Sequence, residues 1–178
     1  LGSRYDLAPL VIQAGNPTAV PPIPEILEDE QSFKRRVQMA FDGLNTAGSI
    51  DGYIFFALGA DGRVADAKVV SPEPCEMVVT ILSIEGNGTV SNDLLIKVRD
   101  VFGMSADGLS QSNTPSKVRP QGDRVTIQSA EIIGYNVEAQ LQILPGPDSQ
   151  VVLAAANQSL LQYQKEQRRL GADITRSG

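Results

Sequence analysis

Acidic side chains are the most frequent residues in this chain that could carry out chemistry. Glu28, Asp29 and Glu30 stand in a row, and such a run could hold a cation or supply a pair of catalytic carboxylates. Acids immediately before a helix have a simpler explanation, because the positive end of the helix dipole favours negative charge there. Asp61 and Asp66 also have ordinary interpretations, Asp61 as a turn residue and Asp66 as a residue on a strand face.

Cys75, the single thiol, could act as a nucleophile. The chain contains no histidine, and a carboxylate follows the thiol at Glu76, so the sequence offers no base or cation that would favour the reactive thiolate. We interpret Cys75 as a bystander that forms no internal disulfide. A protein without a disulfide does not depend on an oxidising compartment to fold.

The remaining motifs also have ordinary explanations. The turn Gly86-Asn87-Gly88 lacks the spacing of a phosphate-binding loop. Asn87 and Asn157 match the short glycosylation pattern, which occurs by chance, and Asn157 falls inside a predicted helix. The basic groups at 34–36 and 167–169 are typical of solvated helix faces. The sequence therefore predicts no catalytic, cofactor-binding or metal-ligating residues.

Composition narrows the function classes. The 178 residues are 42% hydrophobic and 20% charged, which is typical of a globular protein. The absence of histidine excludes Ser-His-Asp and Cys-His catalysis and histidine-ligated metal sites. A net charge of -6 repels polyanions, so we expect no nucleic-acid partner. No apolar run approaches the roughly 20 residues of a membrane span, and we expect no membrane partner.

Apolar periodicity predicts helices near 29–44, 50–58 and 92–102 and another that starts at Pro147 and Asp148 and ends at Gly171. Ser49 should cap the second helix and Gly59 should end it. Strands are expected near 64–70, 76–83, 123–130 and 133–143, and apolar residues on both faces of 76–83 indicate an interior strand. The first helix should bury Phe33, Val37, Ala40, Phe41 and Leu44, and the last should bury Val152, Ala156, Leu160 and Tyr163.

These elements predict an α+β fold, with helices packed on antiparallel or mixed sheets and two β-β-α-like units preceded by a helical segment. The expected divisions are an extended arm or linker at 1–27, a helical segment with the first unit at 28–104, a polar loop at 105–122, and the second unit at 123–178. Asp173 resembles a helix cap without a helix behind it, so we expect the second unit to be truncated and the chain to be an internal piece.

Alternation is clearest at 133–143, and one face of that strand should reach the core. We expect Val137, Ala139 and Leu141 to pack against the same helices as Leu95, Val98 and Leu160.

Four stretches together resemble one family. They are "SFKRRVQMAFDGLNTAGSIDGYIFFALGADGRVADAKVVSPEP", "VVTILSIEGNGTVSNDLL", "VRPQGDRVTIQSAEIIGYNVEAQLQILPGPD" and "QRRLGADITRSG". The combination resembles the baseplate assembly protein J family of contractile-tailed phages of the P2 and Mu type. The chain departs from the family pattern in a longer loop at 105–116 and in Phe56, where a histidine is expected.

This resemblance implies a structural protein of the tail baseplate wedge, which joins wedges around the tail hub, and no enzyme. It implies other wedge proteins and copies of the chain itself as partners, hence a homo-oligomer, and a place in the virion tail after assembly in the bacterial cytoplasm. Two other functions are kept open, a carboxylate-based hydrolase of cell-wall glycans and a module that binds a small ligand or nucleic acid.

Overall fold

A computed structural model describes most of the chain, namely residues 6–44, 48–110, 116, 118–142 and 148–172. Two compact units make up the protein, Leu1–Ile132 and Ile133–Gly178. Helices and small sheets are both present, so the predicted α+β class is confirmed. The finer division at residues 28, 105 and 123 stays a prediction.

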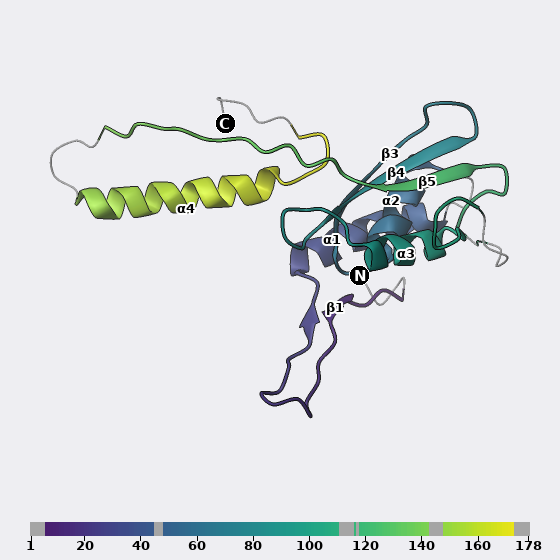
Figure 1. Cartoon of the computed structure of the whole chain (residues 1–178), viewed down its shortest axis with the longest axis horizontal. Coiled ribbons are helices and arrows are strands. Elements are labelled where there is room, and N and C mark those ends of the chain that lie inside the picture. The colour runs from purple at the N-terminus through teal and green to yellow at the C-terminus, as the bar shows by residue number, and fades with distance from the viewer. Residues whose placement is uncertain (1–5, 45–47, 111–115, 117, 143–147, 173–178) are drawn as a thin grey trace. The chain divides into compact units, whose positions relative to one another are not determined.

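The first unit begins with a hairpin. Strands β1 (Val11–Gln13) and β2 (Ile26–Leu27) pair antiparallel, and an isolated bridge joins Asn16 to Ile23 nearer the tip. The hairpin stands away from the rest of its unit (Figure 1). The extended path predicted for this region is therefore folded back on itself.

Two helical segments follow the hairpin. Helix α1 (Glu30–Gln38) begins where Asp29 accepts hydrogen bonds from two backbone amides, and it continues into the 3-10 helix η2 (Met39–Leu44). The prediction that Phe41 and Leu44 are buried is wrong, because they are 72% and 68% exposed. A 3-10 helix has three residues per turn instead of 3.6, so these positions rotate away from the predicted apolar face.

Helix α2 (Ile50–Gly59) starts at Ser49, whose hydroxyl accepts a hydrogen bond from the Gly52 amide. This cap and the predicted end at Gly59 are confirmed.

A three-stranded mixed sheet lies beside these helices. Its order is β3 (Val64–Val70), β4 (Glu76–Ser83) and β5 (Arg124–Ser129), with β3 antiparallel and β5 parallel to β4. Helix α3 (Asn92–Val101) provides the crossover that the parallel pair requires. The interior position predicted for the strand at 76–83 is confirmed.

The core of the first unit lies between one face of this sheet and helices α2 and α3, which gather on that side (Figure 1). Its most deeply buried apolar residues, all 0% exposed, are Ala57, Val79, Ile81, Leu94, Val98 and Phe102. Tyr53 stacks on Phe102 with ring centroids 5.5 Å apart. The opposite face carries Lys68, Thr126 and Gln128, and it is exposed at these positions.

The second unit contains helix α4 (Ser149–Gln167), capped by Asp148 as predicted. The helix ends four residues before Gly171, where the sequence placed its exit. Every residue of the predicted stripe, at positions 152, 156, 160 and 163, is half-buried, and most of the other residues of α4 are exposed. The helix cap predicted at Asp173 lies outside the described residues.

The strand predicted at 133–143 is wrong over its described part. Residues 131–142 form no strand, and Ile143 lies outside the described residues. Val137 and Leu141 are 47% and 49% exposed, so they do not reach a core. Alternation determines which side chains share a face, but a strand also needs a neighbour for its backbone hydrogen bonds, and the described residues provide none there.

Truncation of a core side chain should destabilise the protein far more than truncation of an exposed one. Leu94→Ala should lower the free energy of unfolding by about 2–5 kcal/mol, because the site is fully buried and truncation leaves a cavity. Leu109→Ala, at a residue 87% exposed, should change it by less than about 0.5 kcal/mol. Urea unfolding followed by circular dichroism measures both, and equal losses would contradict the core described above.

Candidate functional site

The acidic run at 28–30 does not form a joint site. Glu28 turns inward to Arg36, whereas Asp29 caps helix α1. Glu30 is exposed and makes an ion pair with Lys34, with Nζ to Oε1 at 2.7 Å. Three neighbouring carboxylates thus have three separate partners, and no cation site forms between them.

The other candidate residues from the sequence also do not come together in one site. Cys75 is exposed and has a backbone φ of 62°, and it is the last residue of the turn between β3 and β4. Gly86 and Gly88 lie in a turn that the Gly88 amide closes on the Glu85 carbonyl at 3.0 Å. Asp66 accepts a hydrogen bond from Arg35 at 2.8 Å. Among the described residues no three His, Cys, Asp or Glu side chains are grouped so that they could hold a metal.

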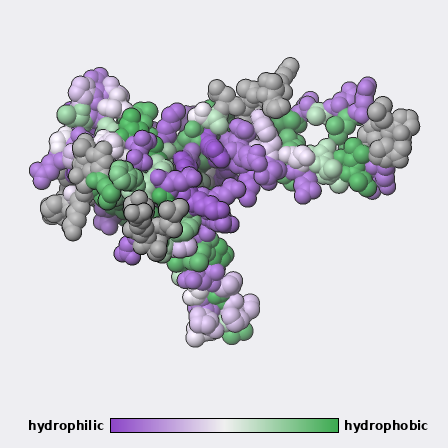
Figure 2. Space-filling view, turned by 180° about the vertical axis from the view of Figure 1, so that it is seen from behind, coloured by the Kyte–Doolittle hydropathy of each residue, from purple (hydrophilic) through white to green (hydrophobic). Residues whose placement is uncertain are grey.

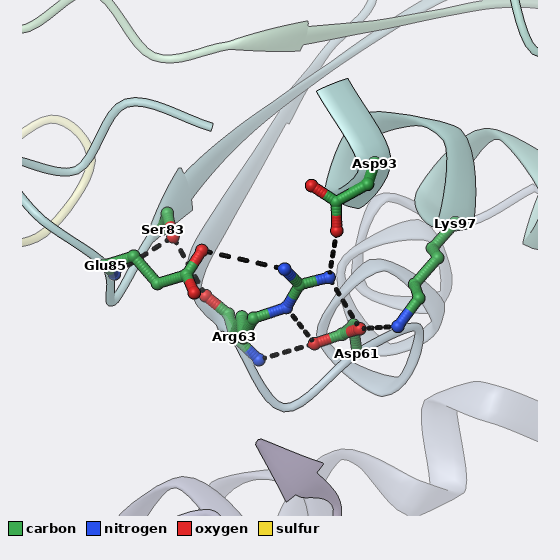
Figure 3. A network of polar contacts seen from close by, with 6 residues as sticks. All are labelled: Asp61, Arg63, Ser83, Glu85, Asp93 and Lys97. Atoms are coloured by element: carbon green, nitrogen blue, oxygen red, sulfur yellow. Dashed lines mark hydrogen bonds and ion pairs between the residues drawn. The ribbon is translucent and has the colours of Figure 1, made fainter. Parts of the chain in front are cut away.

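Asp61 is the exception, because several charged side chains converge on it. Its carboxylate is 5% exposed and accepts hydrogen bonds from Arg63 Nε at 3.0 Å and Lys97 Nζ at 2.6 Å. Arg63 Nη2 also lies 2.8 Å from Asp93, and Nη1 lies 3.7 Å from Glu85. We call these five residues the corner network (Figure 3).

The corner network joins three elements. Asp61 and Arg63 lie in the turn between α2 and β3, Glu85 follows β4, and Asp93 and Lys97 lie on α3. Burial alone would raise the pKa of Asp61, but hydrogen bonds from Arg63 and Lys97 outweigh it and lower that pKa to about 2. The hydrogen bond to Asp61 in turn raises the pKa of Arg63. A carboxylate held ionised by two cations cannot donate a proton at neutral pH, so the network suits positioning rather than acid catalysis.

A second buried ion pair holds the hairpin. Arg36 donates to both carboxylate oxygens of Glu28, and the side chains are 5% and 4% exposed. Arg36 Nη2 also donates to the Ala8 carbonyl at 2.8 Å, and Glu28 accepts from the Leu10 amide at 2.8 Å. We call Glu28, Arg36 and the backbone of Ala8 and Leu10 the arm clamp. It fixes the base of the hairpin to helix α1.

A third cluster ties the chain before β5 to the core. Tyr53 donates to Asp123 at 2.7 Å, and burial together with this bond raises the pKa of Tyr53. Arg119 donates to the carbonyls of Phe102 and Asp123 at 3.0 and 2.8 Å. These contacts anchor the described end of the polar loop next to the start of β5.

Comparison with known proteins gives one informative result. No family model matches the chain. The curated Baseplate protein J of Escherichia phage P2 is 40% identical over 174 residues, which is 98% of this chain. The resemblance to the baseplate J family is confirmed. The chain spans 54% of the length of that relative, and none of the described helices is both long and apolar enough to cross a membrane.

In this J-like chain, sequence reasoning missed the buried charge pairs. Asp61 and Lys97 are separated by 36 positions and Arg119 lies in a segment without periodicity, so no local pattern connects them. Arg36 was grouped with Lys34 and Arg35 as a solvated face, although it is 4% exposed. The one usable signal was the pair of opposite charges in "ADGR", since Asp61 and Arg63 close their own turn.

The lowered pKa of Asp61 predicts that this residue stabilises the fold less at acid pH than at neutral pH. Its folded pKa lies below its unfolded value, so Asp61 contributes stability at neutral pH that is lost as the pH falls through about 4 toward 2. Between about pH 7 and about pH 3, Asp61→Asn should lose roughly 1 kcal/mol less unfolding free energy than the wild type. Asp100→Asn, at an exposed position of α3, should lose as much as the wild type.

The arm clamp predicts that removing one partner of the buried pair destabilises the protein more than replacing both partners. Glu28→Gln leaves the buried Arg36 without its counter-charge and should cost about 3–5 kcal/mol, whereas the pair Glu28→Gln with Arg36→Met should cost less than that single change. Hydrogen exchange at the Leu10 amide should accelerate in Glu28→Gln. The matched control Glu30→Gln breaks only an exposed pair and should leave stability almost unchanged. Similar losses for both glutamates would contradict the clamp.

Proposed function

We propose that this chain is a structural part of a contractile-tail baseplate wedge, in which copies of it join neighbouring wedges around the tail hub. The observation that carries the proposal is the 40% identity to Baseplate protein J of phage P2, which extends over 98% of the chain. Residues shared along nearly the whole chain include both packing and surface positions of the two proteins, whereas a shared local motif would cover one site only.

The side chains of the first unit support a positioning role. The buried charges of the corner network and the arm clamp are matched by opposite charges within hydrogen-bond distance. An enzyme that used two carboxylates would need one of them protonated and both facing a cleft. Asp61 is instead held ionised, and the acids at 28–30 point to different partners. We therefore propose a protein that acts by contact and not by catalysis.

The proposed location is the tail baseplate of a phage or prophage particle, assembled in the cytoplasm of the bacterial host. The proposed partners are other wedge proteins and further copies of this chain. Exposed apolar side chains on the hairpin and on α4, such as Val20 at 98% and Val151 at 66%, provide surface for such contacts.

The proposal is tested in the phage or prophage that encodes the chain. Deletion of the gene should give particles without a complete baseplate, and the wild-type gene supplied in trans should restore them. Immunogold labelling of purified tails should place the chain at the tail end. Chemical cross-linking of intact tails should join copies of the chain to one another or through one wedge protein.

Two controls sharpen the result. Leu109→Ala, which leaves the core unchanged, should restore tails as well as the wild type. Asp100→Asn and Asp61→Asn should both restore tails at neutral pH if the carboxylates have no catalytic role, provided the folded fraction is matched. Normal tails that lack the chain would overturn the proposal, and so would wall-digesting activity that Asp61→Asn abolishes.

A further inference from the structure

The tip of the hairpin is an uncharged, proline-rich surface that no element of its own unit covers. Residues 16–24 are exposed except for the half-buried Ala19, and Val20 is 98% exposed. Residues 7–24 contain no charged side chain in a chain whose net charge is -6. Figure 2 shows the hairpin standing clear of the rest of its unit, with a small hydrophobic area at its mostly pale end and a larger one nearer its base.

The tip is also held in a defined shape. Asn16 and Ile23 exchange two backbone hydrogen bonds of 2.8 and 2.9 Å, and the Asn16 side chain accepts from the amide and hydroxyl of Thr18. The four prolines between 17 and 24 restrict the backbone further. A segment ordered before it binds loses little entropy on binding, which favours contact with a partner.

Two anchors hold the base of the hairpin in place. The arm clamp fixes Ala8 and Leu10 to helix α1. At Gly62 the hairpin base lies so close that an added Cβ would come within 3.0 Å of Ile12 Cγ1. At about 3.3 Å per residue, the tip lies roughly 25 Å from this base. The tip therefore projects away from its own unit and cannot reach the surfaces beside the hairpin base of the same copy.

A pocket of about 380 Å³ opens beside the hairpin base of the same unit. Its apolar lining comes from α2, from α3 and from the first residues of the hairpin, and includes Leu7, Pro9, Leu10, Phe55, Phe56 and Val101. Two charged residues, Asp6 and Arg36, also line it, and the charge of Arg36 is already matched by Glu28. Gly59 forms part of the wall and presents no side chain.

The tip and the pocket are chemically matched. The tip is a closed turn and not an extended polyproline segment, so the match is one of apolar contact, in which its prolines and Val20 pack against the phenylalanine rings and leave water. Charge also selects this pair, since two copies with a net charge of -6 repel each other wherever acidic surfaces meet. An uncharged tip that enters a pocket whose arginine is already neutralised brings no like charges together.

We propose that residues 16–24 of one copy dock into the Phe55–Phe56 pocket of a second copy. This inference rests on the proposed function, which brings copies of the chain together, and it names the contact that joins them. The surfaces differ on the two sides, so the contact is head-to-tail, and a joined pair keeps one free pocket on the first copy and one free tip on the second. Repetition of such a contact closes a ring when the rotation allows it.

Paired cysteines test the contact in the intact protein. Cys75 is replaced by serine in every version, and a Val20→Cys protein is mixed with a Gly59→Cys protein under oxidising conditions. The expected product is a mixed dimer at least about five times more abundant than from Val20→Cys with Gly122→Cys. Gly122 is a matched control, because a Cβ at either glycine meets no atom within 4 Å. Equal yields from the two mixtures would overturn the inference.

Blocking variants give an independent measurement. Gly59→Leu fills the pocket from its own wall without backbone strain, and self-association measured by sedimentation should weaken at least about tenfold. Gly122→Leu should not weaken it. Val20→Asp places a charge on the tip and should weaken association similarly, while Leu109→Asp, also at an almost fully exposed residue, should not. If Gly59→Leu fails to fold, the Val20→Asp and Leu109→Asp pair still decides.

The two proposals fail differently. Tails that contain the chain and assemble normally with Gly59→Leu and Val20→Asp would overturn the tip contact and leave the structural role intact. Tails that never contain the chain would remove the proposed function itself.

Discussion

The parallel pairing of β5 with β4 is the constraint on which the first unit depends. Parallel neighbours cannot be joined by a tight turn, so the chain must leave the sheet, cross one face and return. Helix α3 makes that crossing, and its residues Leu94 and Val98, with Phe102 directly after the helix, are 0% exposed as a result. Asp61 and Arg63 hold the start of α3, and Tyr53 and Arg119 hold the chain where it re-enters the sheet. The core is therefore enclosed by a crossover attached at both ends.

The buried ion pairs specify geometry, whereas the apolar core supplies stability. Removing two charges from water costs several kcal/mol, and their attraction only roughly offsets that cost, so a buried pair is weak evidence for stability. A pair does specify geometry, because each charge tolerates one placement of its partner. The arm clamp accordingly determines where the hairpin points, and the corner network determines how α2, β3 and α3 meet. A protein that works by presenting surfaces to neighbours needs this control of direction.

Local chemistry made much of the fold predictable. Ser49 and Asp148 were recognisable as caps because capping depends on residues two or three positions apart, and β4 was recognisable as interior because both of its faces are apolar. Contacts between distant residues were not predictable, and the bond from Lys97 to Asp61 is one of them. The alternation at 133–143 failed for a related reason, since a strand requires a neighbour that its own sequence does not specify. Composition predicts only that no histidine-dependent site forms, whereas the tip and its pocket required coordinates.

The sheet register also dictates when the first unit can close during synthesis. β4 pairs with β3 as soon as the first hairpin of the sheet has left the ribosome, but its other edge waits for β5, with Glu76 opposite Arg124. At about 5–20 residues per second, that edge stays open for roughly 2–10 s. Throughout this interval the apolar residues of β4 border an unpaired backbone, which is a template for pairing with another nascent chain. Nascent chains on neighbouring ribosomes of the same messenger are the nearest molecules that could pair with this open edge. We therefore expect the yield of folded protein to depend on the spacing of ribosomes as well as on the stability of the finished fold.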